Sequence, residues 1–213
     1  MKLDKKSLLL YAVTDRTWVG NQTLSQQVEE TLKAGTTLLQ LREKDLSSEE
    51  FLEEAKIMRK ICEKYKVPFM INDNVEIALA CNADGVHVGQ SDRMARDVRK
   101  ALGADKIIGV SAQTVEQAKL AQEQGADYLG VGAVFNTSTK LDAAEVSFET
   151  LKAICRAVTI PVIAIGGISL KNISELKDTE IDGIAVVSAI FASENITEAT
   201  HKLLEKVKDI VNE

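Results

Sequence analysis

The chain has 213 residues, of which 45% are hydrophobic and 27% charged, and its formal net charge is −6 at pH 7. These values predict one globular domain, residues 1–213, with a full hydrophobic core. The acidic balance and an aromatic content of only 4% argue against a nucleic-acid partner or binding to an anionic membrane surface.

The N-terminus and the cysteines bear on location. The first apolar run, residues 8–13, follows three lysines but is too short for a signal sequence or a membrane span. The three cysteines, Cys62, Cys81 and Cys155, show no CxxC spacing, and an odd number predicts reduced thiols in the cytoplasm. We interpret all three as packing residues rather than nucleophiles.

Short apolar runs recur along the chain, and each ends in polar or glycine residues. Because helical patterns separate them, they predict a parallel sheet. Eight such repeats predict closure into a (β/α)8 TIM barrel, whose chemistry sits at the carboxyl ends of the strands. The runs are residues 8–13, 38–41, 67–71, 85–88, 107–110, 128–131, 162–165 and 184–187. The predicted helices are residues 25–34, 47–65, 74–81, 92–102, 114–125, 147–158, 170–177 and 196–211.

The second run leads into a polar segment with alternating faces. Gln40, Arg42 and Lys44 share one face, and the leucines between and before them share the other. The leucines should pack outward against helices, which places the polar trio inside the barrel. Two cations inside a barrel need an anion, so we expect an anionic ligand here. A solvated edge, or an ion pair with Glu43 or Asp45, is the alternative.

Carboxylates follow the next two strands. Asp73 comes after residues 67–71, and Asp92 comes shortly after residues 85–88, so both should lie on adjacent loops at one rim. Two carboxylates with few other protein ligands suit Mg²⁺, which keeps waters and shares substrate phosphate oxygens. A turn residue at 73 and a helix N-cap at 92 are the alternatives. The inward cations beside them favour the metal.

The last two strands and the long loop before them predict a second anion site. Gly166-Gly167 follows the seventh run and Ser188 follows the eighth, where barrels often bind phosphate through backbone N–H groups. The loop at residues 132–145 carries Thr137-Ser138-Thr139-Lys140 and could bridge the two sites. No nucleophile–base pair stands out, and we interpret His87 as a packed, hydrogen-bonded residue.

The chain resembles the thiamine-phosphate synthase family almost from end to end. The resemblance begins at Tyr11-Ala-Val-Thr-Asp15 and extends to Gly183-Ile-Ala-Val-Val-Ser188. No single motif is specific, but together they are highly so. The motifs between these ends are Gln40-Leu-Arg42-Glu-Lys44, Ile71-Asn72-Asp73, Gly85-Val-His-Val-Gly-Gln90-Ser-Asp92, Gly109-Val-Ser111, Gly132-Ala-Val-Phe-Asn-Thr137-Ser-Thr139-Lys140 and Ile165-Gly-Gly167-Ile168.

The resemblance implies a magnesium-dependent transferase of thiamine biosynthesis. Such an enzyme joins hydroxymethylpyrimidine diphosphate to a thiazole phosphate, releases pyrophosphate and forms thiamine phosphate. The implied mechanism is dissociative: pyrophosphate departs, the aminopyrimidine ring spreads the positive charge at its methylene, and the thiazole nitrogen attacks. Positioning both ligands and excluding water would supply much of the rate.

The resemblance also implies a role for each motif residue. Mg²⁺ would be held by Asp73 and Asp92, and catalysis would fall to Arg42, Lys44, Ser111 and Lys140. The pyrimidine diphosphate would be held by Gln40, Arg42, Lys44, Asn72, Ser111 and Lys140, and Leu41 and Glu43 of the same motif are included among the substrate-binding residues. The thiazole phosphate would be held by Thr137, Ser138, Thr139, Gly167, Val187 and Ser188.

One loop departs from the family's pattern. After the sixth strand the family usually reads Gly-Pro-Val-Phe-Pro-Thr, and here Ala133 and Asn136 replace the two prolines. This difference predicts a loop that is more mobile before substrate arrives. The Thr-x-Thr-Lys core of the loop is intact, so the assignment stands.

Three other functions stay open. A thiazole tautomerase shares the barrel and the thiazole phosphate site but would not need the full diphosphate-binding set found here. A non-catalytic, ligand-sensing barrel would use the same contacts. A phosphate-binding epimerase or isomerase would need an acid–base pair on facing strands, which the sequence does not offer. The oligomeric state is not fixed by the sequence, and a homo-oligomer stays open.

Overall fold

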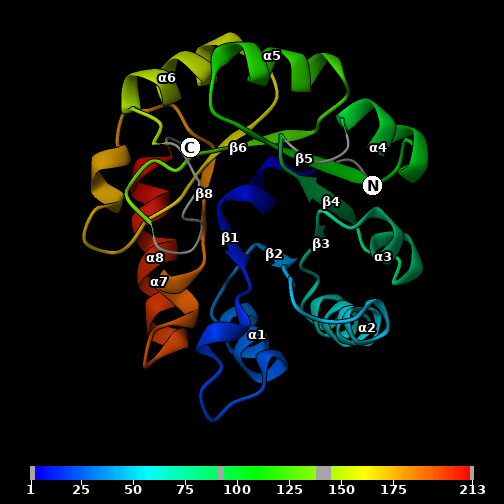
Figure 1. Ribbon diagram of the computed structural model, residues 1–213. Helices are drawn as coiled ribbons and strands as arrows, with labels where there is room; N and C mark the ends of the chain where they lie inside the picture. The colour runs from blue at the N-terminus through cyan, green and yellow to red at the C-terminus, as the bar shows by residue number, and fades with distance from the viewer. Residues whose placement is uncertain (1–2, 91–93, 138–144, 212–213) are drawn as a thin grey trace.

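The computed structural model describes residues 3–90, 94–137 and 145–211 of the chain. Within them, eight parallel strands close into a barrel in which each strand pairs with the next along the chain and β8 pairs with β1. Helices surround the barrel (Figure 1). The (β/α)8 architecture predicted from the repeated runs is therefore confirmed.

The strands fall where the apolar runs predict them, with small differences at their ends. The first strand begins later than expected because the residues before it form a short 3-10 helix, η1. The fifth strand extends two residues further, as far as Ala112. The strands are β1 Leu10–Val13, β2 Leu38–Leu41, β3 Phe69–Asn72, β4 Gly85–Val88, β5 Ile107–Ala112, β6 Tyr128–Val131, β7 Val162–Ile165 and β8 Gly183–Val186.

The predicted helices are largely confirmed, and side-chain caps fix several of their starts. Thr23 and Ser47 each form a reciprocal capping box with the residue three positions on, so two orphan N–H groups are satisfied at each start. The α-helices are α1 Leu24–Lys33, α2 Ser48–Tyr65, α3 Val75–Ala80, α4 Ala95–Leu102, α5 Val115–Glu123, α6 Phe148–Ala157, α7 Ser188–Phe191 and α8 Ile196–Ile210. The 3-10 helices are η1 Lys5–Leu8, η2 Arg16–Trp18 and η3 Ile173–Leu176.

One helical prediction was wrong in detail, and one short helix was not predicted. The segment 170–177 holds only the 3-10 helix η3, because its buried residues Ile173 and Leu176 are spaced three apart, which suits three residues per turn. The four-residue helix α7 was not predicted. It begins at Ser188, directly after β8 and beside the barrel mouth.

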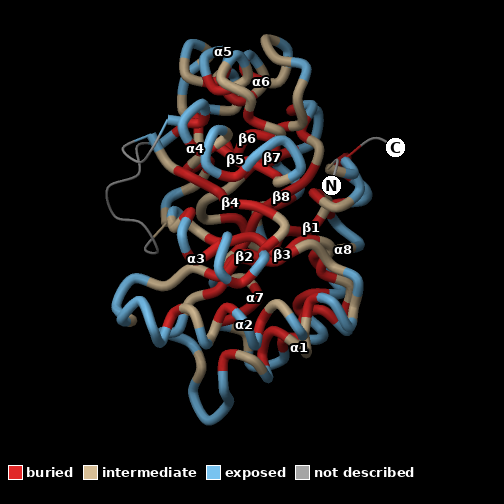
Figure 2. Tube along the Cα trace, turned by 90° about the vertical axis from the view of Figure 1, so that its right-hand side faces the viewer, coloured by how far each residue is buried: buried red, intermediate tan, exposed pale blue. Residues whose placement is uncertain are grey.

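Strand alternation divides the core into two clusters. Leu39 and Leu41 belong to the large outer cluster between strands and helices. Tyr11, Leu38 and Tyr128 belong to a smaller cluster inside the barrel. Figure 2 shows the strands buried at the centre and the exposed residues on the outer sides of the helices. Among the described residues, no helix has the length and apolar character that a membrane span needs.

An aspartate repeats at the amino-terminal end of every second strand from β4 on. Asp84, Asp127 and Asp182 each accept a hydrogen bond from a backbone N–H of the preceding strand, at 2.8, 2.7 and 2.7 Å. Each also pairs with a cation, so the closed end of the barrel is fastened by repeated charge-assisted contacts. The sequence places the expected site at the opposite end, where the strands have their carboxyl ends.

Candidate active site

A cavity of about 330 Å³ opens at the carboxyl ends of the strands. It is lined by residues that lie in or directly after all eight strands, as the closed topology requires. The predicted site residues that line it are Gln40, Arg42, Lys44, Asn72, Asp73, Ser111, Thr137, Gly167, Val187 and Ser188. Segments far apart in the sequence therefore converge on one mouth.

Four predicted site residues cannot be placed. Asp92, Ser138, Thr139 and Lys140 lie outside the described residues. Their expected roles stay predictions.

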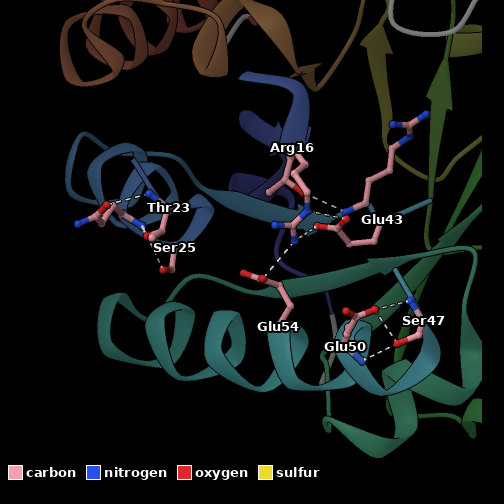
Figure 3. A network of polar contacts seen from close by, with 10 residues as sticks. Arg16, Thr23, Ser25, Glu43, Ser47, Glu50 and Glu54 are labelled. Carbon is pink, nitrogen blue, oxygen red and sulfur yellow. Dashed lines mark hydrogen bonds and ion pairs between the residues drawn. The ribbon is translucent and has the colours of Figure 1, made fainter. Parts of the chain in front are cut away.

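Two predicted substrate-binding residues do not line the cavity. Leu41 is fully buried in the outer cluster, because it alternates with Gln40 and Arg42 along β2. Glu43 also turns aside: its Oε1 and Oε2 accept from Nη2 and Nε of Arg16 at 2.8 and 3.2 Å. Figure 3 shows this pair, with Glu54 of α2 as a further partner of Arg16. Of the five consecutive residues from Gln40 to Lys44, only Gln40, Arg42 and Lys44 therefore contribute side chains to the cavity.

The engagement of Glu43 decides the charge of the mouth. Among the described residues, no carboxylate lies within ion-pair distance of Arg42 or Lys44, and both line the cavity. The start of their segment is fixed by a hydrogen bond of 3.0 Å from the Arg42 backbone N–H to Thr14 Oγ1. The alternative of an ion pair with Glu43 is therefore wrong for both cations. Arg42 and Lys44 therefore present positive charge to the cavity.

Asp73 offers a carboxylate on the neighbouring loop. Its backbone is left-handed, with φ of 59°, and its N–H donates to the His87 carbonyl at 2.9 Å. Asn72 Nδ2 donates to Asp73 Oδ2 at 2.6 Å, which orients the carboxylate. The part of the chain that the structure describes holds no group of three or more metal-ligating His, Cys, Asp or Glu side chains. One oriented carboxylate at a cavity wall fits a cation such as Mg²⁺, which takes most of its oxygens from water and substrate.

The opposite wall, after β7 and β8, is neutral. Gly166 and Gly167 have φ of 98° and 67°, a backbone conformation that favours glycine. A Cβ on Gly167 would lie 2.4 Å from the Asn136 carbonyl oxygen, so this turn packs directly on the loop after β6. The side chain of Asn172 braces the turn by donating to the Gly167 carbonyl at 2.9 Å. This wall offers backbone and hydroxyl groups rather than charge.

The floor of the cavity is polar and buried. Tyr11 and Tyr128 are 1% and 0% exposed, and their hydroxyls are 3.0 Å apart. Burial raises the pKa of both phenols, so both stay protonated at neutral pH. His87 bonds at both ring nitrogens, to Tyr128 and Ser111, which confirms its interpretation as a packed residue.

Sequence reasoning missed one tyrosine and two glutamines that line the cavity, and it missed Tyr128, whose hydroxyl bonds that tyrosine. Tyr11 lies two residues before Val13 on β1, and alternation from an inward Val13 would have indicated it. Gln90 was quoted only as part of a motif, yet its Nε2 donates to the Ser111 carbonyl at 2.6 Å. Gln113 also lines the cavity. No sequence signal distinguished Gln113 from a surface residue.

Comparison with known proteins shows which family this chain is similar to. The family profile described as "Thiamine monophosphate synthase" matches residues 10–190. A thiamine-phosphate synthase of Clostridium tetani is 54% identical over 91% of this chain and 93% of its own. Another, of Ruminiclostridium cellulolyticum, is 55% identical over 92% and 93%. A solved thiamine phosphate pyrophosphorylase from Pyrococcus furiosus superposes with a TM-score of 0.90 at 37% identity, covering 98% of this chain and 99% of that one.

Proposed function

Because this chain belongs to the thiamine monophosphate synthase family, we propose that its barrel mouth couples hydroxymethylpyrimidine diphosphate to a thiazole phosphate. The products are thiamine phosphate and pyrophosphate, so the enzyme is a transferase of thiamine biosynthesis. The cytoplasmic location stays a prediction, and the oligomeric state stays open.

One observation carries the assignment of roles within the cavity. Arg42 and Lys44 line it without a carboxylate partner among the described residues, while Glu43 between them is held by Arg16. Two uncompensated cations suit a diphosphate, whose charge grows on the leaving oxygens as the bond to the pyrimidine methylene breaks. We assign these two side chains to binding and stabilising the departing pyrophosphate.

The neutral wall suits the second substrate. Gly167, Val187 and Ser188 offer backbone and hydroxyl groups to a monophosphate, as the loops after the last two strands often do in barrels. With the two anions on opposite walls, the thiazole nitrogen would face the pyrimidine methylene between them. Orientation of both substrates and exclusion of water supply rate without a strong base.

Asp73 is the described residue that would help to hold Mg²⁺, and Asp92 is its expected partner. The ion would neutralise the diphosphate and stabilise the leaving group. The Asn72 contact would keep the Asp73 carboxylate turned toward the ion. Asp73→Asn should therefore raise the Mg²⁺ concentration needed for half-maximal binding of pyrophosphate, measured by calorimetry. An unchanged Mg²⁺ requirement would remove Asp73 from the ligand set.

The activity is tested with purified protein, Mg²⁺ and both substrates. Thiamine phosphate should form only when both substrates are present, and Arg42→Gln should lower kcat by about 10². The exposed Arg156 at the closed end of the barrel provides the matched control, Arg156→Gln, with unchanged kcat. A protein that binds both substrates without forming product would be a sensor. One that binds only the thiazole phosphate would favour the tautomerase.

A further inference from the structure

A continuous row of hydrogen bonds crosses the interior of the barrel and joins two cavity-lining residues. Gln40 Nε2 lies 2.5 Å from the Tyr11 hydroxyl, which lies 3.0 Å from the Tyr128 hydroxyl. Tyr128 in turn lies 2.9 Å from His87 Nδ1, and His87 Nε2 lies 3.0 Å from Ser111 Oγ. We call these five residues the interior row. They come from β2, β1, β6, β4 and β5.

Two strand glycines make room for the middle of this row. A Cβ on Gly109 would lie 2.3 Å from the Tyr128 hydroxyl and 2.5 Å from His87 Nδ1. Gly109 stands between these residues in the sheet, paired with His87 on one side and Tyr128 on the other. A Cβ on Gly130 would lie 3.0 Å from His87 Cε1. The barrel is therefore shaped around the contact between Tyr128 and His87.

The direction of each hydrogen bond follows from the number of protons available. Gln40 Nε2 can only donate, so the Tyr11 oxygen accepts from it. The Tyr11 hydroxyl is buried and its other partner is Tyr128, so Tyr11 donates to the Tyr128 oxygen rather than leaving a buried hydroxyl proton without a hydrogen bond. Tyr128 in turn donates its own hydrogen bond to His87 Nδ1. A neutral imidazole with a bare Nδ1 carries its proton on Nε2, which donates to Ser111 Oγ.

The two ends of the row are thereby fixed. Ser111 Oγ already accepts inside the protein, so its own proton is directed to the cavity that it lines. At the other end, Gln40 Nε2 donates to the Tyr11 hydroxyl, and among the described residues no group donates to Gln40 Oε1. The cavity floor thus presents an acceptor at Gln40 and a donor at Ser111.

We propose that Tyr11, Tyr128 and His87 are positioning residues that set this acceptor–donor pattern and thereby select a heterocycle with an exocyclic amine and a ring nitrogen. This inference rests on the proposed function and deepens it, because an aminopyrimidine is such a heterocycle. The amine would donate to Gln40, and the ring nitrogen would accept from Ser111. None of the three positioning residues needs to transfer a proton.

The tautomer of His87 tests the proposal without any activity measurement. The chain has only two histidines, and His201 is exposed on α8, so His201→Gln assigns both sets of ring signals. In protein labelled with nitrogen-15 histidine, two-bond proton–nitrogen correlations should show His87 with its proton on Nε2 and a bare Nδ1. A proton on Nδ1 would mean that His87 donates to Tyr128 and accepts from Ser111, so Ser111 would not offer its proton to the cavity, and it would overturn the proposal.

Substitution of Tyr128 tests the function of the row. Tyr128→Phe removes the donor to His87 Nδ1, so His87 should lose its single tautomer and Ser111 its fixed orientation. The KM for the pyrimidine diphosphate should rise about tenfold, the loss of one hydrogen bond, while the KM for the thiazole phosphate changes less than about twofold. Equal changes in both KM values, or none in either, would overturn the proposal.

Controls separate positioning from general damage. Thr200→Val removes another buried hydroxyl, which bonds Thr31 and the Ile196 carbonyl on the outside of the barrel, and should leave both KM values unchanged. Tyr11→Phe cuts the row nearer Gln40 and should shift the same KM as Tyr128→Phe, so it serves if the first variant does not fold. An inactive wild-type protein with the expected His87 tautomer would refute the proposed function while keeping the row.

Discussion

Arg16 donates hydrogen bonds to both carboxylate oxygens of Glu43, at 2.8 and 3.2 Å, and so links the segment after β1 to the segment after β2. These hydrogen bonds to the carboxylate raise the pKa of the Arg16 guanidinium, and the Glu43 side chain is only 4% exposed. Glu43 is thereby kept from Arg42 and Lys44 on either side of it. The positive charge of the mouth depends on a residue that does not line it.

Release of Glu43 should weaken diphosphate binding. Arg16→Ala leaves the Glu43 carboxylate without its bidentate partner and able to turn toward its cationic neighbours. We expect a several-fold higher KM for the pyrimidine diphosphate, a smaller salt dependence of that KM, and an unchanged KM for the thiazole phosphate, measured by steady-state kinetics. Arg156→Ala breaks a comparable bidentate pair with Glu180 and should change neither. A normal KM in Arg16→Ala would contradict the role assigned to the Arg16–Glu43 pair.

The glycine turn after β7 predicts a selective effect on the other substrate. Gly167→Ala adds a Cβ 2.4 Å from the Asn136 carbonyl oxygen at a backbone φ of 67°, so the turn must move away from the loop after β6. The KM for the thiazole phosphate should rise more than the KM for the pyrimidine diphosphate. Gly103→Ala is the control, because Gly103 has a similar φ of 81° with open space around it and lies at the end of α4. Matching kinetics in the two variants would show that the turn does not bind the phosphate.

The aspartates at the closed end predict stability rather than activity. Asp84 Oδ2 accepts from the Phe69 backbone N–H at 2.8 Å and pairs with Arg59, whose side chain is 19% exposed. Asp84→Ala would leave a backbone donor and a largely buried cation without this partner, so the free energy of unfolding should fall by about 2–4 kcal/mol in urea titrations. Glu194→Ala, at an exposed site, should cost less than about 0.5 kcal/mol. An equally small loss in Asp84→Ala would show that the aspartate contacts are dispensable.

The thiols of the buried Cys62 and the half-buried Cys155 predict a loss of stability at alkaline pH. Burial raises the pKa of Cys155 to about 12 and raises the pKa of Cys62 further, while unfolded thiols ionise near 8.5. Their contribution to stability is full below the unfolded pKa, and it declines as pH rises toward the folded pKa because the unfolded chain releases the protons first.

The alkaline effect can be isolated at one thiol. Cys62→Ala should flatten the decline in the free energy of unfolding between about pH 8.5 and pH 10.5. It should also lower stability at neutral pH through the cavity that it leaves. The His201→Gln variant should keep the wild-type slope. Rapid reaction of all three native thiols with a thiol reagent at pH 8 would show that the thiols are not protected.

The sequence indicated the barrel and most of its mouth because these depend on local patterns. Repetition of apolar runs predicted the strands, and alternation along β2 placed Gln40, Arg42 and Lys44 inward. The same alternation placed Leu41 outside, against its assignment from the motif. Helix α7 was not predicted, and the 3-10 helix η3 was predicted as a longer helix, because segments this short carry little periodic signal.

What the sequence determined by itself is the fold, the family and the end of the barrel that does the chemistry, since these follow from short-range order repeated eight times. The tertiary structure decided which partner each polar group takes. Glu43 bonds Arg16 from 27 positions away rather than the cations beside it, and Tyr11 meets Tyr128 across a separation of 117 positions. Such pairings depend on which side chains face each other after the barrel closes. The spacing of residues along one strand does not say which side chain of another strand they will meet.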